Sequence, residues 1–561
     1  MITGITIENF KGIRERVKLD FRPITLLFGA NSAGKSTIVH ALHYAREVFE
    51  RHNLDADQTI AGGDYVDLGG FRNFVNGHDE SATITLGFEV DLIDYGNSWF
   101  DPLDALTDAL QFERFSDGYL DNFASFDSVE VIVAISWSQL QEKAYVSSFV
   151  VRDQGKEIGR ISANSDGRRV TLSLNPDHPS FGSLKLWASG ESDFEPVDEV
   201  HENAEESCLK KCIPFLDALF ENDENGNYFL SDLSDALPIN DDTLTFVSRE
   251  DSDNDELQEL FPDSILKHRV AEDLVDGLSR IFLFPLKEIR ESITSFHYLG
   301  PIRKTPPRNY KPPRYPDPSR WSSGLGAWDA LQSGSDQLFD SVSSWLSDPD
   351  NLDAGCHIER RIFLELDYAD PIVRALMSRR AFDDIDEHIG SHLASAPTSS
   401  RIMIVPNGTD IELRPQDVGI GISQVLPVIV TALEGSERLL AIEQPELHIH
   451  PRLQAEIADL FIEAIHNNKH RFIIETHSEH LILRLLRRIR ETEVNKAPTH
   501  RRLRTDDLAI YYLKQEDGSS HALKIDVDVK GEFIQPWPDD FFEIDFYERF
   551  DVDRNERPEA E

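Results

Sequence analysis

A glycine-rich segment near the N-terminus constrains the fold of this 561-residue chain more than any other feature. The segment Gly29-Ala30-Asn31-Ser32-Ala33-Gly34-Lys35-Ser36-Thr37 fits the pattern G-x-x-x-x-G-K-[ST]. It follows the short apolar run ITLLF and precedes a stretch with helical periodicity. In this setting backbone N–H groups surround a phosphate, and the helix N-terminus adds its positive dipole. The segment therefore predicts a phosphate-binding loop within an α/β fold.

The side chains of this loop indicate a nucleoside triphosphate, ATP, bound with Mg²⁺. Lys35 would reach the β- and γ-phosphates, and the hydroxyl of Ser36 would hold the metal ion. The residues of the loop that we predict to bind the nucleotide are Gly29, Asn31, Ala33, Gly34, Lys35, Ser36 and Thr37.

Two later segments place polar side chains at the ends of apolar runs. The run RLLAIE ends at Glu443, and a carboxylate at a strand end is what Mg²⁺ needs beside a phosphate-binding loop. The run FIIET leads into His477 at the edge where ligands bind open α/β sheets. A lone histidine there is usually structural, but after the other two motifs it becomes a candidate γ-phosphate sensor. Alternating strand and helix patterns from about residue 400 to 515 predict a parallel sheet flanked by helices.

The order of these motifs resembles that of the ABC/SMC-like ATPase head. The glycine-rich segment DVGIGISQ precedes Glu443 by about twenty residues, and His477 follows Glu443 by 34. More closely, NFKGI, GANSAGKST, IEQPELHIHP and ETHSEHLILRLLRRI look like prokaryotic AAA-family ATPases of the RecF- or OLD-like kind. The segments HYLGPIRKTPPRNY and GEFIQPWPDDFFE resemble a subgroup that ends in a small domain of unknown function. The resemblance covers roughly residues 1–75, 295–320 and 400–550.

The resemblance implies roles for individual residues. Lys11 would lie near the nucleotide, although a solvated turn lysine is an equally open interpretation. Glu443 would organise Mg²⁺ together with Ser36, and His477 would be the switch histidine. The remaining three residues would form a signature that caps the γ-phosphate bound by an opposite subunit: Gly419, Gly421 and Ser423. ATP and Mg²⁺ would then be shared between two heads, so a homodimer or higher oligomer is expected.

Gln444 departs from the pattern of the resembling families, in which a glutamate commonly follows the metal-organising acid and acts as general base. A glutamine can orient water but cannot accept its proton near neutral pH. Orientation can suffice in phosphoryl transfer, because electrostatic stabilisation dominates there. Glu446 could supply a base if its loop turned it inward. Slow hydrolysis is therefore predicted, with Gln444, Glu446 and His477 as the catalytic candidates. A scaffold that retains ATP is the alternative.

The composition limits the cell compartment and the partners. The chain has 101 acidic and 56 basic residues, a net charge of −45, which repels nucleic acid at long range. Three cysteines favour a reducing compartment, and a metal site at Cys208 and Cys212 is disfavoured. No leader peptide and no apolar run of about 18 residues is apparent, so a cytoplasmic protein without a membrane span is expected.

Two basic patches stand out against this acidic background. They could contact DNA, or they could pair with carboxylates across a subunit interface, and the structural interpretation is favoured. The helical patch contains Arg484, Arg487, Arg488 and Arg490 and continues through Lys496 to Arg501, Arg502 and Arg504. The patch in the proline-rich arm contains Arg303, Lys304, Arg308, Lys311 and Arg314.

The predicted fold is α/β, an ABC/SMC-like P-loop ATPase head with a large β-rich and mixed insertion. The expected divisions are residues 1–78 and 400–505 for the two parts of the head, 79–295 for a β-rich and acidic insertion, 296–399 for a proline-rich arm and helical region, and 506–561 for a small C-terminal domain. The resemblance points to a dimerising regulatory or sensor ATPase in antiphage defence, as in Septu-like systems, with an effector such as a nuclease in trans. A RecF-like DNA-binding repair clamp is the alternative from a different class.

Overall fold

The computed structural model describes most of the chain. The described residues are 1–92, 118–119, 126–166, 169–179, 181, 185–186, 208–239, 243–249, 264–377, 393, 396 and 398–538. The last 23 residues of the predicted C-terminal domain lie outside these ranges, as does part of the predicted β-rich and acidic insertion at residues 79–295.

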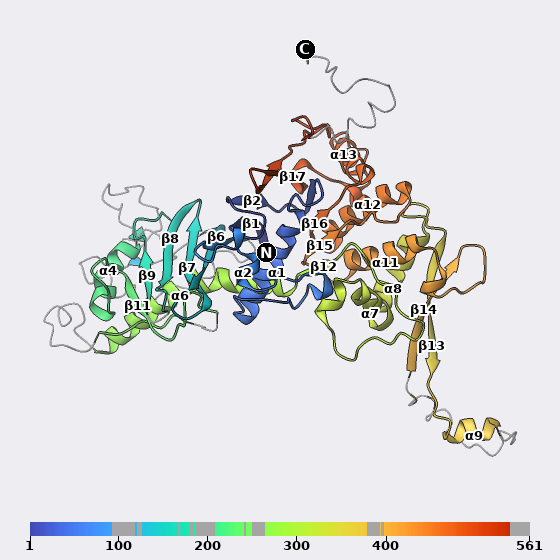
Figure 1. Cartoon of the computed structure of the whole chain (residues 1–561), viewed down its shortest axis with the longest axis horizontal. Helices are drawn as coiled ribbons and strands as arrows, with labels where there is room; N and C mark the ends of the chain where they lie inside the picture. Colours follow the sequence, from blue (N-terminus) through green and yellow to red (C-terminus); the bar gives the residue numbers. More distant parts are fainter. Residues whose placement is uncertain are drawn as a thin grey trace, which may run out of the picture.

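A mostly parallel sheet of six strands forms the centre of the molecule (Figure 1). Its strand order is β12-β15-β16-β3-β17-β18, in which β18 alone is antiparallel to its neighbour. Every residue of β3 is buried, as expected for a parallel strand covered on both faces. The bounds are β3 (Ile24–Gly29), β12 (His297–Leu299), β15 (Leu439–Glu443), β16 (Arg471–Glu475), β17 (Leu508–Glu516) and β18 (Ser519–Lys524).

Helices cover both faces of this sheet. Leu27 and Ile473 point into a core that includes α1, whereas Leu26 and Ile474 point into a second core that includes α11, α12 and α13. Alternate residues of one strand thus serve opposite layers, which is the period-2 pattern of a strand. The helices are α1 (Lys35–Arg51), α7 (Leu325–Ser333), α8 (Asp336–Ser347), α11 (Ile420–Leu433), α12 (Pro451–Asn467) and α13 (Glu479–Glu493). The predicted α/β class and the predicted parallel sheet are confirmed.

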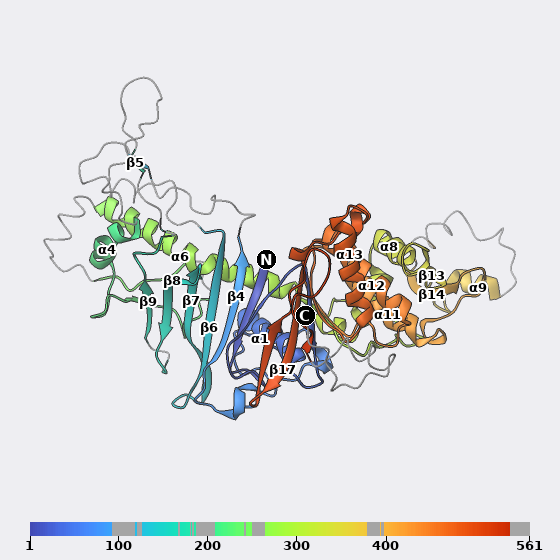
Figure 2. The same ribbon diagram turned by 90° about the horizontal axis from the view of Figure 1, so that it is seen from above.

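A second, antiparallel sheet of eight strands forms the other lobe, with the long helix α6 (Ser264–Thr294) running across it (Figure 2). Its order is β11-β9-β8-β7-β6-β4-β1-β2. Because β1 pairs with β4, strands on the two sides of the predicted division at residue 78 share one sheet. The bounds are β1 (Ile2–Glu8), β2 (Val17–Asp20), β4 (Ile84–Asp91), β6 (Ser128–Ser138), β7 (Lys143–Asp153), β8 (Lys156–Ala163), β9 (Val170–Leu174) and β11 (Tyr228–Leu230).

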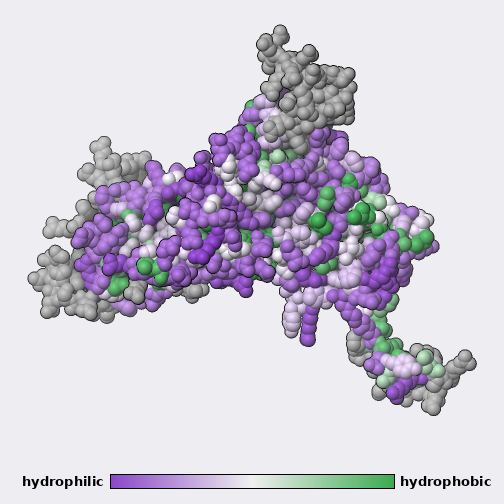
Figure 3. Space-filling view, in the orientation of Figure 1, coloured by the Kyte–Doolittle hydropathy of each residue, from purple (hydrophilic) through white to green (hydrophobic). Residues whose placement is uncertain are grey.

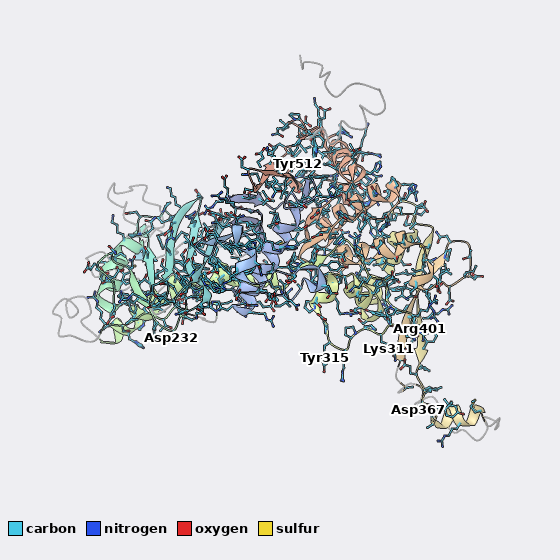
Figure 4. All side chains as sticks on the ribbon, viewed as in Figure 1. Asp232, Lys311, Tyr315, Asp367, Arg401 and Tyr512 are labelled. Atoms are coloured by element: carbon cyan, nitrogen blue, oxygen red, sulfur yellow. The ribbon has the colours of Figure 1, made fainter. Side chains whose placement is uncertain are left out.

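A two-stranded ribbon of β13 (Cys356–Leu364) and β14 (Thr398–Pro406) projects from the first lobe and carries α9 (Pro371–Met377) (Figure 1). In the side-chain view, Arg401 lies on β14, Lys311 lies near this ribbon and Asp367 lies at its far end (Figure 4). The remaining elements are α2 (Phe71–Phe74), α4 (Cys208–Leu219), the strand pair β5 (Gly118–Tyr119) and β10 (Lys185–Leu186), and single 3₁₀ turns at Gly63–Tyr65, Asn76–His78, Pro318–Trp321, Pro415–Asp417, Thr499–Arg501 and Thr505–Asp507.

The surface is mostly hydrophilic, with apolar side chains exposed near the ribbon (Figure 3). On β13 these are Ile362, Phe363 and Leu364. Within the described ranges, no helix has the length and apolar character that a membrane span requires.

Candidate nucleotide site

The phosphate-binding loop joins β3 to α1, as the sequence predicts, and its two outer glycines are required by backbone geometry. Gly29 has φ 138° and Gly34 has φ 100°, which L side chains rarely adopt. A Cβ atom on Gly29 would lie 2.2 Å from the carbonyl oxygen of Leu513 on β17. A Cβ on Gly34 would lie 2.5 Å from Oγ of Ser520 on β18. The loop is therefore packed tightly against the neighbouring strands.

Lys35 and Ser36 both contact Glu475, which is not among the site residues predicted from the sequence. The Ser36 hydroxyl donates a hydrogen bond to Oε2 of Glu475 at 3.0 Å. Nζ of Lys35 lies 3.7 Å from Oε1 of the same carboxylate and donates to the carbonyl oxygens of Gly29 and Ala30, each at 3.0 Å. One feature of the sequence does point to Glu475: like Glu443, it ends an apolar run.

Strand order explains why Glu475 is the carboxylate that reaches the loop. β16 lies next to β3, whereas β15 is one strand further away. Glu443 and Glu475 are register partners at the carboxyl ends of β15 and β16, so their side chains are neighbours. The hydroxyl of Tyr298 on β12 donates to Oε1 of Glu443 at 3.1 Å. The assignment of Glu443 to Mg²⁺ stays a prediction.

The carboxylates of Glu443 and Glu475 are buried beside each other, and the pKa of each is raised. Burial raises the pKa of Glu443 to about 7, and the charge of Glu475 acts in the same direction. Burial also raises the pKa of Glu475, opposed by the charge of Lys35 and the hydrogen bond from Ser36. Hard oxygen donors of this kind fit Mg²⁺, which uses one or two carboxylates together with substrate phosphates. The residues that would hold the ion are Ser36, Glu443 and Glu475.

The loops after β15 and β16 contain the three predicted catalytic candidates. Gln444 has φ 44°, and its backbone N–H donates to the carbonyl oxygen of Glu475 at 2.7 Å. Oε1 of Glu446 accepts a hydrogen bond from the backbone N–H of His477 at 2.7 Å. The loop thus turns Glu446 inward toward His477.

Glu446 and His477 each keep a buried polar atom without a hydrogen-bond partner among the described residues, Oε2 and Nε2 respectively. Burial raises the pKa of Glu446, which makes its carboxylate a better proton acceptor. Burial and the charge of Lys35 lower the pKa of His477, so its imidazole is neutral at neutral pH.

The predicted signature residues lie at the start of α11. Gly419 is the N-cap of this helix and is exposed, and a Cβ added there would meet no atom within 4 Å. A Cβ on Gly421 would lie 3.2 Å from the carbonyl oxygen of His448, so the start of α11 adjoins the loop after β15. Ser423 is buried, and its hydroxyl donates to the carbonyl oxygen of Ile420 at 2.9 Å. Its capping role stays a prediction.

Lys11 has a partner within the chain and is half-buried. Its Nζ lies 2.7 Å from Nδ1 of His40 on α1. Burial lowers the pKa of Lys11, and burial with the charge of Lys11 lowers the pKa of His40 to about 3, so the neutral imidazole accepts the hydrogen bond. The carbonyl of the next residue, Gly12, accepts a hydrogen bond from the backbone N–H of Ser520, the residue that packs against Gly34. The turn therefore lies beside the phosphate-binding loop.

Seven of the thirteen residues in the two basic patches pair with carboxylates of the same chain. This supports the favoured structural interpretation, but the pairs are within the chain rather than across a subunit interface. In the helical patch the pairs are Arg484 with Glu456 and Asp459, Arg487 with Glu491, Arg488 with Asp459 and Glu491, and Arg501 with Asp459 and Glu463. In the arm they are Lys304 with Asp64, Arg308 with Asp417, and Lys311 with Glu365.

Solved structures similar to the chain include SMC heads. The Smc head bound to the C-winged helix domain of ScpA is 10% identical over 94% of this chain and 98% of that one, with a TM-score of 0.37. An Smc head domain with an extended coiled coil, bound to the C-terminal domain of ScpA and derived from Pyrococcus furiosus, is 11% identical over 94% and 96%, with a TM-score of 0.33. The SMC head domain from Thermotoga maritima is 8% identical over 94% and 99%, also at 0.33.

A family model gives the firmer comparison. Residues 1–88 and 359–482 match the AAA ATPase domain. No curated protein matches the chain. The matched segments contain the phosphate-binding loop, both strand-end carboxylates and His477, which are the residues that the fold brings to one edge of the parallel sheet. Two parts of the chain, which residues 89–358 separate in the sequence, are thus similar to an AAA ATPase domain.

Proposed function

We propose that this protein binds and hydrolyses ATP with Mg²⁺, and that two copies meet to complete two nucleotide sites. The observation that carries the proposal is the placement of Lys35 and Ser36 against the carboxylate of Glu475, with Glu443 beside it. Arriving phosphates and Mg²⁺ would compete for the side chains that Glu475 holds. The loop is therefore poised to exchange an internal partner for a ligand.

The chemistry follows from the residues around this edge. Mg²⁺ would supply charge neutralisation at the phosphates, where phosphoryl transfer develops negative charge. Lys35 binds phosphate oxygens, and the backbone N–H groups of the loop orient them. Glu446 accepts the proton of the attacking water, because its raised pKa and buried second oxygen suit a base. Gln444 orients that water, and His477 contacts the γ-phosphate as a neutral donor.

Head dimerisation is proposed from the start of α11. Gly419 and Ile420 are exposed there, with no side chain at Gly419 to obstruct an approaching phosphate. The N-terminus of a helix of 14 residues favours anions. Because Gly419 and Ile420 are exposed, this end of α11 is accessible to the nucleotide bound by a second copy.

The cellular role proposed is that of a regulatory or sensor ATPase in antiphage defence, with an effector such as a nuclease in trans. The support is the resemblance of the motifs and the large part of the chain outside the ATPase segments. A DNA clamp is less favoured, because Arg484, Arg488 and Arg501 already pair with carboxylates.

The test is ATP hydrolysis by the purified chain, measured over a range of protein concentrations. Wild type is compared with Lys35→Ala and with the matched control Lys311→Gln, which removes a positive charge on the arm near the ribbon (Figure 4). We expect turnover per molecule to rise with concentration in wild type and control, and to be lost with ATP binding in Lys35→Ala. ATP bound tightly but unchanged after long incubation would establish the scaffold alternative instead.

A further inference from the structure

Arg303 is a buried arginine that is not among the residues that would bind the nucleotide or the metal ion. It follows β12 in the proline-rich arm and is 2% exposed. No carboxylate of the described residues lies within ion-pair distance of it; its Nη2 donates instead to the carbonyl oxygens of Glu443 at 2.6 Å and Gln444 at 3.1 Å. Burial lowers the pKa of Arg303 to about 10, so it stays charged at neutral pH. A buried charge bonded to backbone carbonyls fixes that backbone firmly.

The backbone of Arg303 is held in turn by α11. Its N–H donates to Oε1 of Gln424 at 3.1 Å, and Nε2 of Gln424 donates to its carbonyl oxygen at 2.7 Å. Gln424 lies one turn into α11, next to Ser423. Gly324, at φ 77°, packs against the side chain from the other side, since a Cβ there would lie 3.1 Å from Cβ of Arg303. One residue thus joins the start of α11 to the loop after β15.

Some N–H groups of the guanidinium have no hydrogen-bond acceptor among the described residues. Its Nε and Nη1 are buried without hydrogen-bond partners among the described residues, and so is Oε2 of Glu446. Among nearby charges, that of Glu446 does most to raise the pKa of Arg303 against the effect of burial. Buried polar atoms are costly to leave unpaired. The unpaired N–H groups therefore leave Arg303 able to donate to a further acceptor.

We propose that Arg303 is a positioning residue for ATP hydrolysis, which couples the start of α11 to the backbone of Glu443 and Gln444. The inference rests on the proposed function, because it assigns a role within that site. In this role Arg303 acts through the carbonyl oxygens of Glu443 and Gln444 and not on the reacting atoms. When α11 engages a phosphate of a second copy, its shift reaches Gln424, then Arg303, then the turn that carries Gln444 and Glu446. Hydrogen bonds of fixed direction transmit such a shift, because each has a narrow range of favourable geometry.

The experiment compares Arg303→Lys, Gln424→Leu and the control Lys311→Gln in steady-state ATP hydrolysis. Lysine keeps the charge but lacks the planar fork that bonds two carbonyls at once. Leucine removes both bonds to the backbone of Arg303 and leaves the guanidinium in place. We expect kcat to fall about 10- to 100-fold in both variants, as for a misplaced catalytic group, while KM and the Kd for ATP stay within about twofold. The control should retain wild-type values.

Unchanged kcat in either folded variant overturns the proposal, and so does a fall in kcat matched by weaker ATP binding and a lower Tm, which indicates a purely structural role. If one variant does not fold, the other decides.

Hydrogen exchange separates this proposal from the proposed function. In wild type, ATP should slow exchange at residues 29–37, 420–424 and 443–447. Absent protection at residues 29–37 contradicts ATP binding itself. Protection at residues 29–37 and 420–424 that extends equally to 443–447 in Arg303→Lys contradicts the coupling alone.

Discussion

At the residue scale, Glu475 is the strand-end carboxylate that contacts the phosphate-binding loop. Its carboxylate contacts both Lys35 and Ser36, whereas Glu443 bonds to Tyr298. Because Ser36 is the predicted Mg²⁺ ligand of the loop, the neighbouring carboxylate influences how the ion is held.

We predict that Glu475→Gln raises the Mg²⁺ concentration needed for ATP hydrolysis more than Glu443→Gln does. An increase of about 10- to 100-fold in the Mg²⁺ concentration needed for half-maximal turnover is expected for the loss of a partner of a metal ligand. Titration of Mg²⁺ at fixed ATP measures it. Equal effects of the two substitutions would argue against the closer role of Glu475.

The raised pKa of Glu443 predicts how stability depends on pH. The unfolded carboxyl has its ordinary pKa, while the folded one titrates at about 7, so the folded state binds the proton more tightly. The contribution of Glu443 to stability is therefore fully present below its ordinary pKa and is lost as pH rises to about 7. The loss amounts to about 3 kcal/mol at most.

Thermal melting of the nucleotide-free protein from pH 5 to 8 measures this effect. Glu443→Gln should melt at a temperature that depends less on pH than that of wild type. A wild-type profile with the opposite slope in this window would contradict the assignment.

At the element scale, α12 and α13 are joined by a buried carboxylate, Asp459, that is 0% exposed. It accepts hydrogen bonds from Arg484, Arg488 and Arg501. We predict that Asp459→Asn destabilises this helix pair by about 3–5 kcal/mol, because it leaves buried arginines without their shared anion.

Calorimetry of Asp459→Asn beside Arg487→Gln provides the measurement. Arg487 makes an exposed pair with Glu491, so its loss should cost only about 0–1 kcal/mol. A small effect at Asp459 would mean that Glu456, Glu463 and Glu491 suffice to neutralise the arginines.

At the scale of the whole molecule, dimerisation through the start of α11 can be blocked without disturbing the fold. Gly419 is exposed and its φ of −54° is open to other residues. We predict that Gly419→Phe binds ATP as wild type does, yet stays monomeric and loses turnover. Light scattering with and without ATP gives the mass. A dimer of Gly419→Phe that turns over normally would place the contact elsewhere.

The phosphate-binding loop was predictable from the sequence, because glycines, lysine and hydroxyl at fixed spacing encode their geometry locally. The buried strands that end at Glu443 and Glu475 were also predictable, since their apolar runs are local signals. Gln444, Glu446 and His477 follow those strands closely, so their meeting at one sheet edge was predictable from parallel pairing.

Tertiary structure alone decided which carboxylate reaches the loop. The order β3-β16-β15 puts Glu475 beside Ser36, and strand order is set by long-range packing that no local pattern encodes. Tertiary packing also decided the burial of Arg303, which the sequence alone presents as one cation of a basic patch. Its burial arises because the arm folds between α11 and the loop after β15, where carbonyl oxygens and Gln424 replace the water that a surface arginine would keep.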